Sequence, residues 1–196
     1  AQHDGAAGAQ TASRVRHQAG DGSQLQAVHK VHLIHQQARV ISMSLEPRAM
    51  LAQWCSRTAL LTAWLGTQTP SRARADIARC LGLALTQVRV IAPDVGGAFG
   101  AKASVAAEEL VVAFAAHHLQ ASVKWTSSRS EEFTSATQGR GARLEGELWL
   151  DAQGRFVHLQ ADMNFPLGAW LAFSAVVPAR NAARILPGPY RVSSID

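Results

Sequence analysis

The sequence predicts an α+β protein with a mixed sheet, a long antiparallel hairpin and packed helices. Strand-like and helix-like segments are mixed along the chain without the regular strand–helix alternation of a parallel α/β fold. Two segments of alternating apolar and polar residues, Leu144–Leu150 and Val157–Met163, are joined by the turn sequence Asp151–Gly154. This pattern is typical of a hairpin with one buried face. Apolar residues at helical spacing fill Thr69–Gly82, whose ends suit the start and the stop of a helix.

The remaining elements are predicted from shorter patterns. Residues 59–66 are apolar on both faces, which indicates a strand covered on both sides. Residues 164–175 are predicted to form a loop and Pro187–Tyr190 a turn. We expect strands at Val28–Gln36, Ala49–Trp54, Ala59–Gly66, Val88–Ala92 and Ser122–Thr126, helices at Val105–Leu119 and 176–185, and a polar turn or helix at Arg129–Phe133.

Length and composition place the chain among ordinary globular proteins. It has 196 residues, of which 47% are apolar, so it can bury a core. No run approaches the ~20 apolar residues that a membrane span needs. Residues 1–25 are polar and small without a period, and we expect a linker or disordered lead-in there, followed by one domain over 26–196. Because the chain lacks an initiator Met and a signal pattern, we expect an internal piece of a longer protein.

Charge and cysteine content narrow the choice of partners. The net charge is +5, but the basic residues are scattered, and only Arg72, Arg74 and Arg79 crowd together. We interpret these three as a solvated helix face, and we expect no nucleic-acid partner. Cys55 and Cys80 are not part of a CxxC pair, so the chain offers no ligand set for an iron–sulfur cluster or a structural zinc ion. We expect buried thiols in a reducing compartment.

Two groups of ionisable residues are candidate sites with simpler explanations. His29, His32 and His35 repeat every three residues, but on an extended segment His32 faces away from the other two. We therefore expect polar positions on a half-exposed strand rather than a metal site. Glu46 lies close to Arg48, and an adjacent arginine would hold its carboxyl ionised, which indicates a structural pair. We nominate no catalytic residue.

The glycine-rich segment Asp94–Lys102 is the strongest candidate for a binding site. It follows a predicted strand and precedes a predicted helix, and glycine there lets backbone N–H groups approach a ligand closely. Such a loop can cradle an anion, although a tight turn would also use glycines. Lys102 is followed by Ala103 rather than Ser or Thr, which argues against a phosphate loop. The spacing also differs from the dinucleotide-binding pattern.

Several segments taken together resemble a known family. In order and spacing they are similar to the first molybdenum-cofactor-binding region in the large subunit of the xanthine dehydrogenase/aldehyde oxidase/carbon monoxide dehydrogenase family. The resemblance extends over about residues 20–196. The segments that carry it are Leu45–Ala49, Gly66–Pro70, Leu81–Leu83, Val88–Lys102, Val123–Thr126, Arg129–Glu131 and Leu186–Tyr190.

The resemblance implies an enzyme that hydroxylates a carbon of an aldehyde or an aromatic heterocycle at a molybdenum–pterin cofactor. The oxygen would come from water, and the electrons would leave through iron–sulfur clusters. Gln68 matches the glutamine that hydrogen-bonds an oxo ligand of molybdenum, and Phe99 also lies near the metal without ligating it. The residues implied to line the cofactor are Gln68, Gly96, Gly97, Ala98, Phe99 and Gly100.

Three alanines depart from the family pattern. The usual loop is richer in glycine, whereas Ala98 and Ala101 add methyl groups here, and alanine at positive φ costs about 1 kcal/mol or more. These two residues motivate an alternative function, a non-catalytic relic or an anion-binding and interaction module derived from the same fold. Ala103 stands where the purine-oxidising branch has a glutamate, so we expect an aldehyde or a nitrogen heterocycle as substrate.

The resemblance also implies a larger assembly. We expect the remaining large-subunit domain, an iron–sulfur subunit and a flavin or cytochrome subunit as partners, and a small-molecule substrate. The cytosine dinucleotide is one candidate form of the pterin. We expect the isolated chain to be catalytically inactive and to retain no stoichiometric molybdenum. The expected compartment is the cytoplasm, with the periplasm as the alternative.

Overall fold

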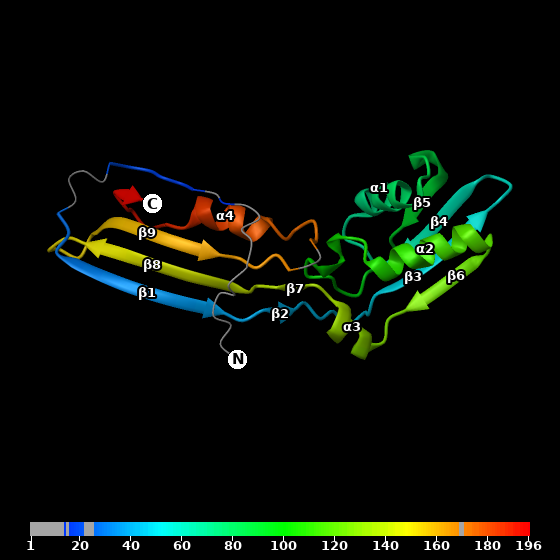
Figure 1. The fold of residues 1–196 in the computed structure, drawn as a ribbon, viewed down its shortest axis with the longest axis horizontal. Coiled ribbons are helices and arrows are strands. Elements are labelled where there is room, and N and C mark those ends of the chain that lie inside the picture. The colour runs from blue at the N-terminus through cyan, green and yellow to red at the C-terminus, as the bar shows by residue number, and fades with distance from the viewer. Residues whose placement is uncertain (1–13, 15, 22–25, 169–170) are drawn as a thin grey trace. The chain divides into compact units, whose positions relative to one another are not determined.

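The chain divides into two compact units in a computed structural model that describes residues 14, 16–21, 26–168 and 171–196 (Figure 1). Unit 1 comprises Ala1–Gln37, Ala142–Pro166 and Val176–Asp196, and unit 2 comprises Ala38–Gly141 and Leu167–Ala175. The lead-in expected at residues 1–25 lies largely outside the described residues. The single domain expected over residues 26–196 contains parts of both units and stays a prediction.

Unit 2 is built on a four-stranded sheet in the order β5-β4-β3-β6. Strand β3 is antiparallel to both β4 and β6, whereas β5 is parallel to β4. A second, two-stranded sheet pairs β2 with β7. The elements are β2 (Val40–Ile41), β3 (Ala49–Cys55), β4 (Leu60–Leu65), α1 (Pro70–Leu81), the 3-10 helix η2 (Leu85–Gln87), β5 (Val88–Ile91), the 3-10 helix η3 (Ala101–Ala103), α2 (Ala107–Leu119), β6 (Ser122–Thr126), α3 (Arg129–Ser135) and β7 (Gln138–Gly139).

Helices α1 and α2 pack on one face of this sheet and close the core. Met50 of β3 is paired with Leu65 of β4, and both are buried together with Ile77 of α1. On the opposite face Leu51 is 37% exposed and Trp64 is only half-buried. The prediction that residues 59–66 are covered on both sides is therefore wrong. Both neighbouring helices lie on the same side, so the alternating residues of β4 meet two different environments.

The ends of the helices follow the sequence signals with one change. Helix α1 begins at Pro70 and stops at Gly82, whose φ of +68° is the left-handed conformation that glycine favours. The Thr69 hydroxyl does not cap the helix; it donates to the carbonyl of Ala103 at 2.9 Å. The N-terminus of α1 is thereby attached to the segment that follows the glycine-rich loop.

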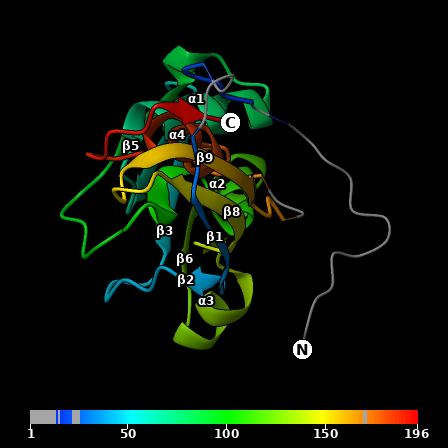
Figure 2. The ribbon, with the colours of Figure 1, turned by 90° about the vertical axis from the view of Figure 1, so that its left-hand side faces the viewer.

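Unit 1 is built on a four-stranded sheet in the order β1-β8-β9-β10, in which the predicted hairpin lies at the centre. Figure 2 shows β1, β8 and β9 side by side. The Asp151 carboxylate shapes the hairpin turn by accepting from the N–H groups of Gln153 and Arg155, each at 2.9 Å. The elements are β1 (His29–Gln37), β8 (Ala142–Leu150), β9 (Phe156–Asn164), α4 (Val177–Ile185) and β10 (Ser194–Ile195).

The sheet of unit 1 is poorly covered. Among its described residues only Ala142 and Ser194 are buried, so the face of the hairpin expected to be buried is half-buried instead. Val31 and Leu33, which share a face of β1, are 54% and 65% exposed. His32 lies on the opposite face of β1, with its Nε2 3.4 Å from a carboxylate oxygen of Glu145.

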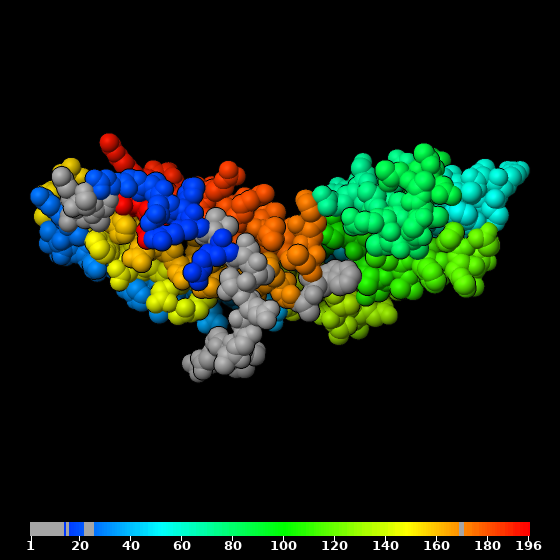
Figure 3. Space-filling model, turned by 45° about the horizontal axis from the view of Figure 1, so that its top comes forward, coloured from blue at the N-terminus to red at the C-terminus, as the bar shows by residue number. Residues whose placement is uncertain are grey.

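Each basic residue of α1 has a partner within unit 2, whose surface Figure 3 shows. The Arg72 guanidinium lies 3.5 Å from the centre of the Phe173 ring. Arg74 donates to the carbonyls of Leu85 and Val88, and Arg79 pairs with Asp76 at 2.6 Å. Because each guanidinium already contacts another residue of unit 2, we assign these three arginines a structural role.

The two thiols differ from the expectation. Cys80 on α1 is exposed and Cys55 at the end of β3 is half-buried, so the prediction of buried thiols is wrong. Cys80 lies one turn after Ile77 on α1, outside the buried set of Ala73, Ile77 and Ala78. No helix among the described residues is long and apolar enough to cross a membrane.

Candidate functional site

The glycine-rich loop between β5 and η3 has an unusual backbone. Gly97 and Gly100 have φ values of +100° and +87°, and Phe99 between them has φ of +49°. A non-glycine residue in this region is strained, and such residues are frequent at functional sites. Ala98 and Ala101 are not at positive φ, so the expected cost of their methyl groups is absent. The strain falls on Phe99 instead.

Four consecutive backbone N–H groups of this loop lack an internal acceptor. Within the described part of the chain, no hydrogen bond uses the N–H of Gly97, Ala98, Phe99 or Gly100. The Phe99 side chain is 74% exposed, and Gly100 is exposed as well. Buried or half-buried N–H groups normally have partners. A row of free donors is therefore presented beside an exposed aromatic ring.

Gln68 lies against the same loop. Its backbone N–H donates to the carbonyl of Lys102 at 3.1 Å, and the Thr67 hydroxyl donates to the same carbonyl at 3.2 Å. The side chain of Gln68 is exposed and makes no hydrogen bond to any described residue. The fold thus brings the backbone of Gln68 to Lys102 at the end of the loop, 34 residues later in the sequence.

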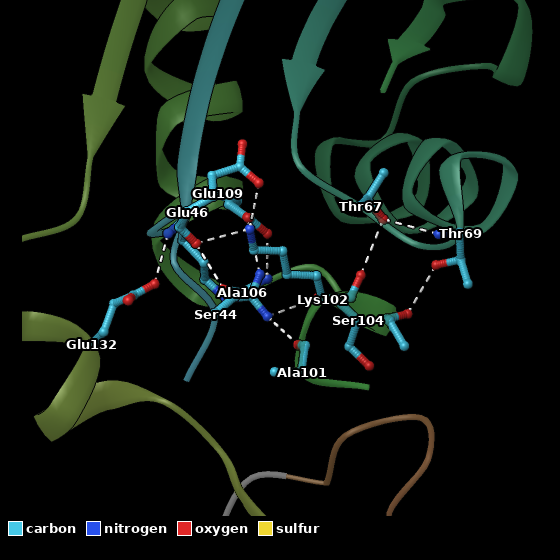
Figure 4. Close-up of polar contacts among 12 residues, drawn as sticks. Ser44, Glu46, Thr67, Thr69, Ala101, Lys102, Ser104, Ala106, Glu109 and Glu132 are labelled. Atoms are coloured by element: carbon cyan, nitrogen blue, oxygen red, sulfur yellow. Dashed lines mark hydrogen bonds and ion pairs between the residues drawn. The ribbon is translucent and has the colours of Figure 1, made fainter. Parts of the chain in front are cut away.

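An ion pair between the buried Lys102 and the half-buried Glu46 joins this loop to the segment before β3 (Figure 4). The Lys102 Nζ lies 2.7 Å from Oε2 of Glu46 and donates to the Glu46 carbonyl at 3.0 Å. The Gly96 N–H donates to the same carboxylate at 2.8 Å, and the Glu46 N–H donates to the Gly96 carbonyl at 3.1 Å. Lys102 is 2% exposed. The two segments are therefore held together at both ends of the loop.

Two glycines provide the space for this pair. A Cβ at Gly96 would lie 2.6 Å from the Cβ of Glu46, a distance that real side chains do not allow. A Cβ at Gly66 would lie 3.2 Å from Oε2 of Glu46 and 3.4 Å from the Lys102 Nζ. These glycines serve close packing around a charged contact, whereas Gly97 and Gly100 serve the turn of the backbone.

The Glu46 carboxyl is held in its ionised form. Burial raises its pKa, but the hydrogen bonds from Lys102 and from the Gly96 N–H outweigh burial, and the pKa is lowered overall. The expectation of an ionised, structural Glu46 is confirmed, but the expected partner is wrong. The chain bends at Leu45 and Glu46, and Arg48 makes its ion pair with Glu109 rather than with Glu46.

Arg48 instead pairs with Glu109 of α2, behind the loop. Its Nη1 donates to Oε1 of Glu109 at 2.9 Å, and its Nη2 donates to the carbonyls of Ala101 and Ser104. Glu109 is 1% exposed, and its second oxygen accepts from the Ala106 N–H at 2.8 Å. Burial raises the pKa of Glu109, which Arg48 and the Ala106 N–H offset only in part.

A second acidic residue fixes the backbone of Arg48. Oε1 of Glu132 accepts from the Arg48 N–H at 2.7 Å, and its Oε2 pairs with Arg129 at 2.7 Å. Arg129 also donates to the carbonyls of Ser44 and Leu45. The segment before β3 is thus attached to η3, α2 and α3 through charged groups.

These charged contacts were not predicted from the sequence. The signal that could have indicated one of them is Glu109, an acidic residue in the first turn of the strongly apolar helix α2. A buried carboxylate needs a cation. Its partner lies 61 residues earlier, and nothing in the local sequence identifies it.

The chain belongs to the family of molybdopterin cofactor-binding domains, whose model matches residues 6–196. The resemblance predicted from the sequence is therefore confirmed, and it places the chain in a family of molybdopterin-dependent oxidoreductases.

Individual relatives agree with this assignment. The chain is 33% identical to the 6-hydroxypseudooxynicotine dehydrogenase complex subunit gamma of Paenarthrobacter nicotinovorans, over 87% of this chain and 21% of that protein. It is 29% identical to the nicotine 6-hydroxylase large subunit of the same organism, over 74% of this chain and 18% of that protein. The chain spans about a fifth of the length of these relatives.

A solved structure confirms the predicted fold class. The quinoline 2-oxidoreductase from Pseudomonas putida 86 has a TM-score of 0.81 and 31% identity, over 86% of this chain and 22% of that chain. The mixture of sheets and packed helices with a long hairpin is therefore a fold that molybdenum hydroxylases share.

Proposed function

We propose that this chain forms one wall of the molybdenum–pterin site in a hydroxylase of the xanthine dehydrogenase/aldehyde oxidase type. The observation that carries the proposal is the row of four free N–H groups at Gly97–Gly100, placed with the free carboxamide of Gln68. Backbone N–H groups and a carboxamide suit the oxo groups and anionic oxygens of such a cofactor.

Each group has a separate part in the proposed site. The Gln68 carboxamide would donate to an oxo group at the metal, and the N–H groups of residues 97–100 would hold the cofactor's oxygens. The exposed Phe99 ring would form an apolar surface near the metal, suited to a flat substrate. When bound, the cofactor would supply oxidation of a carbon centre with oxygen taken from water. The chain itself contributes binding and orientation, and no catalytic base is assigned to it.

The proposed substrate is a nitrogen heterocycle or an aldehyde. The names of the relatives support this choice, since they include a nicotine 6-hydroxylase and an aldehyde oxidoreductase. Ala103 also supports it, because the purine-oxidising branch has an acidic residue at the matching position. The methyl side chain of Ala103 offers no hydrogen bond to a purine.

The proposal includes a larger assembly. We expect the remaining large-subunit domain, an iron–sulfur subunit and a flavin or cytochrome subunit to complete the enzyme. The cytosine dinucleotide form of the pterin and a cytoplasmic or periplasmic location stay predictions. Mass spectrometry of the pterin released from the purified complex would identify its nucleotide.

Purification of the complex that contains this chain tests the proposal. We expect about one molybdenum per large subunit by metal analysis, and 18O from labelled water in the hydroxylated product. Gln68→Ala should lower turnover by about 10–100-fold. Gln53→Ala, which removes another exposed glutamine from β3, is the matched control and should not. A complex without molybdenum would contradict the proposal and favour a non-catalytic module, and equal activity of the two variants would remove Gln68 from the site.

A further inference from the structure

Lys102 is the residue at which the two halves of the candidate site meet. Its carbonyl accepts from the Gln68 N–H and from the Thr67 hydroxyl. Its ammonium binds the carboxylate and the carbonyl of Glu46. The free N–H groups of residues 97–100 therefore lie between two fixed points, the Glu46 contact at Gly96 and the contacts of Lys102.

The charge of Lys102 is not available to a ligand. The residue is 2% exposed, and the Glu46 carboxylate lies 2.7 Å from its ammonium group. A lysine next to a glycine-rich loop commonly binds an anion directly, as in phosphate loops. Here the Lys102 ammonium is neutralised by the Glu46 carboxylate, so it binds another part of the protein rather than the cofactor.

We propose that Glu46 and Lys102 form a clamp that sets the loop Gly96–Gly100 and the Gln68 backbone in their binding geometry before the cofactor arrives. Both are assigned as positioning residues, since their charged groups bind each other and the backbone of Glu46 and Gly96. The clamp reduces the ordering cost of binding, because the row of donors is held in place in its absence. This inference rests on the proposed function for its purpose, but the clamp itself is a property of the chain without cofactor.

The charges around Glu46 allow a clean test. Lys102 is the charged group that contacts its carboxylate among the described residues. On the neighbouring elements, Arg129 of α3 contacts the carbonyls of Ser44 and Leu45 and the carboxylate of Glu132, and Arg48 contacts Glu109 of α2. Replacement of Glu46 by Gln therefore removes the charge that Lys102 needs and leaves the other pairs in place.

Amide hydrogen exchange in the full chain, measured by NMR without cofactor, reports on the clamp. The Gln68 N–H is the decisive probe, because its acceptor belongs to Lys102 and not to the replaced residue. The substitution Glu46→Gln weakens the charged hydrogen bond of the Lys102 ammonium, which holds the carbonyl that Gln68 binds. The protection factor of the Gln68 N–H should therefore fall about tenfold. Protection of the amides in the middle of α2 should be unchanged. Asp76→Asn, the same change in an exposed pair of α1, is the control and should leave Gln68 unaffected.

The pH profile distinguishes a clamp from a general loss of structure. In the wild-type chain, protection at Gln68 should fall as Glu46 becomes protonated, whereas in Glu46→Gln it should be flat with pH. If the variant loses protection in α2 as well, Lys102→Met and the wild-type pH profile decide instead. Protection at Gln68 that is independent of pH and of both substitutions would overturn the clamp. That result would leave the molybdenum analysis of the complex untouched, and absence of molybdenum would equally leave the exchange result standing.

Discussion

The two units of the chain differ in how they bury their residues. All but one of the buried apolar residues among the described positions lie in unit 2, and the exception is Ala142. The charged residues that are buried, namely Lys102, Glu109 and Glu132, also belong to unit 2. In unit 1 the ion pairs, such as Arg143 with Glu145, are at the surface.

This difference shows where the site gets its rigidity. A buried ion pair is intolerant of losing one partner, whereas exposed pairs are screened by water and contribute little. Unit 2 can therefore hold a loop with strained residues such as Phe99 in place. The strands of the unit 1 sheet are paired along their lengths, but few of their described side chains are buried.

The largest expected effect is the loss of Arg48 in unit 2. Arg48→Ala would leave the carboxylate of Glu109, which is 1% exposed, without its cation. We expect a loss of about 3–5 kcal/mol in the free energy of unfolding, measured by urea denaturation and followed at the amides of α2. Arg143→Ala in unit 1 is the control and should change stability by less than about 1 kcal/mol. Equal effects would show that the two units do not differ in the way described.

A substitution at Gly96 tests the close packing around the clamp. The Cβ of Gly96→Ala would lie 2.6 Å from the Cβ of Glu46, so the two segments must move apart. We expect a loss of about 1–3 kcal/mol in stability. Gly139→Ala, whose Cβ would meet no atom within 4 Å, should stay within about 1 kcal/mol of wild type. A neutral Gly96→Ala would mean that the loop adapts without cost.

Acid should weaken unit 2 through Glu46. Burial raises the pKa of this carboxyl. The contacts with Lys102 and the Gly96 N–H lower it by more than burial raises it, so the folded-state pKa lies below the ordinary value of 4.5. The stabilisation is present above 4.5 and is lost as pH falls through the folded-state pKa. Glu109, with a raised pKa, contributes in the opposite direction. The difference in stability between wild type and Glu46→Gln, followed by denaturation from pH 7 downwards, isolates Glu46 and should shrink on acidification; a constant difference would contradict the assignment.

The smallest effect is expected on the open sheet of unit 1. Leu33 is 65% exposed, so Leu33→Thr should change stability by no more than about 0.5 kcal/mol. Thermal unfolding of the two proteins side by side measures this change. A loss of more than about 1 kcal/mol would show that this face is buried in solution.

Much of the fold and one half of the site follow from local sequence. The hairpin around Asp151–Gly154 and the helix between Thr69 and Gly82 are set by residue spacing and by turn and stop residues, which act over a few positions. The glycine-rich loop was identified for the same reason. The membership of the chain in a molybdopterin-binding family followed from the order of several short segments.

The tertiary structure alone decided which residues meet. Glu46 pairs with Lys102 at a separation of 56 residues and Arg48 with Glu109 at 61, although the sequence places Glu46 beside Arg48. It also decided that Phe99 rather than Ala98 takes the left-handed conformation, and that α1 and α2 cover the same face of β4. Local periodicity specifies which side of an element is apolar. The partner of a buried charge depends on how distant elements close around it, and that is determined by packing.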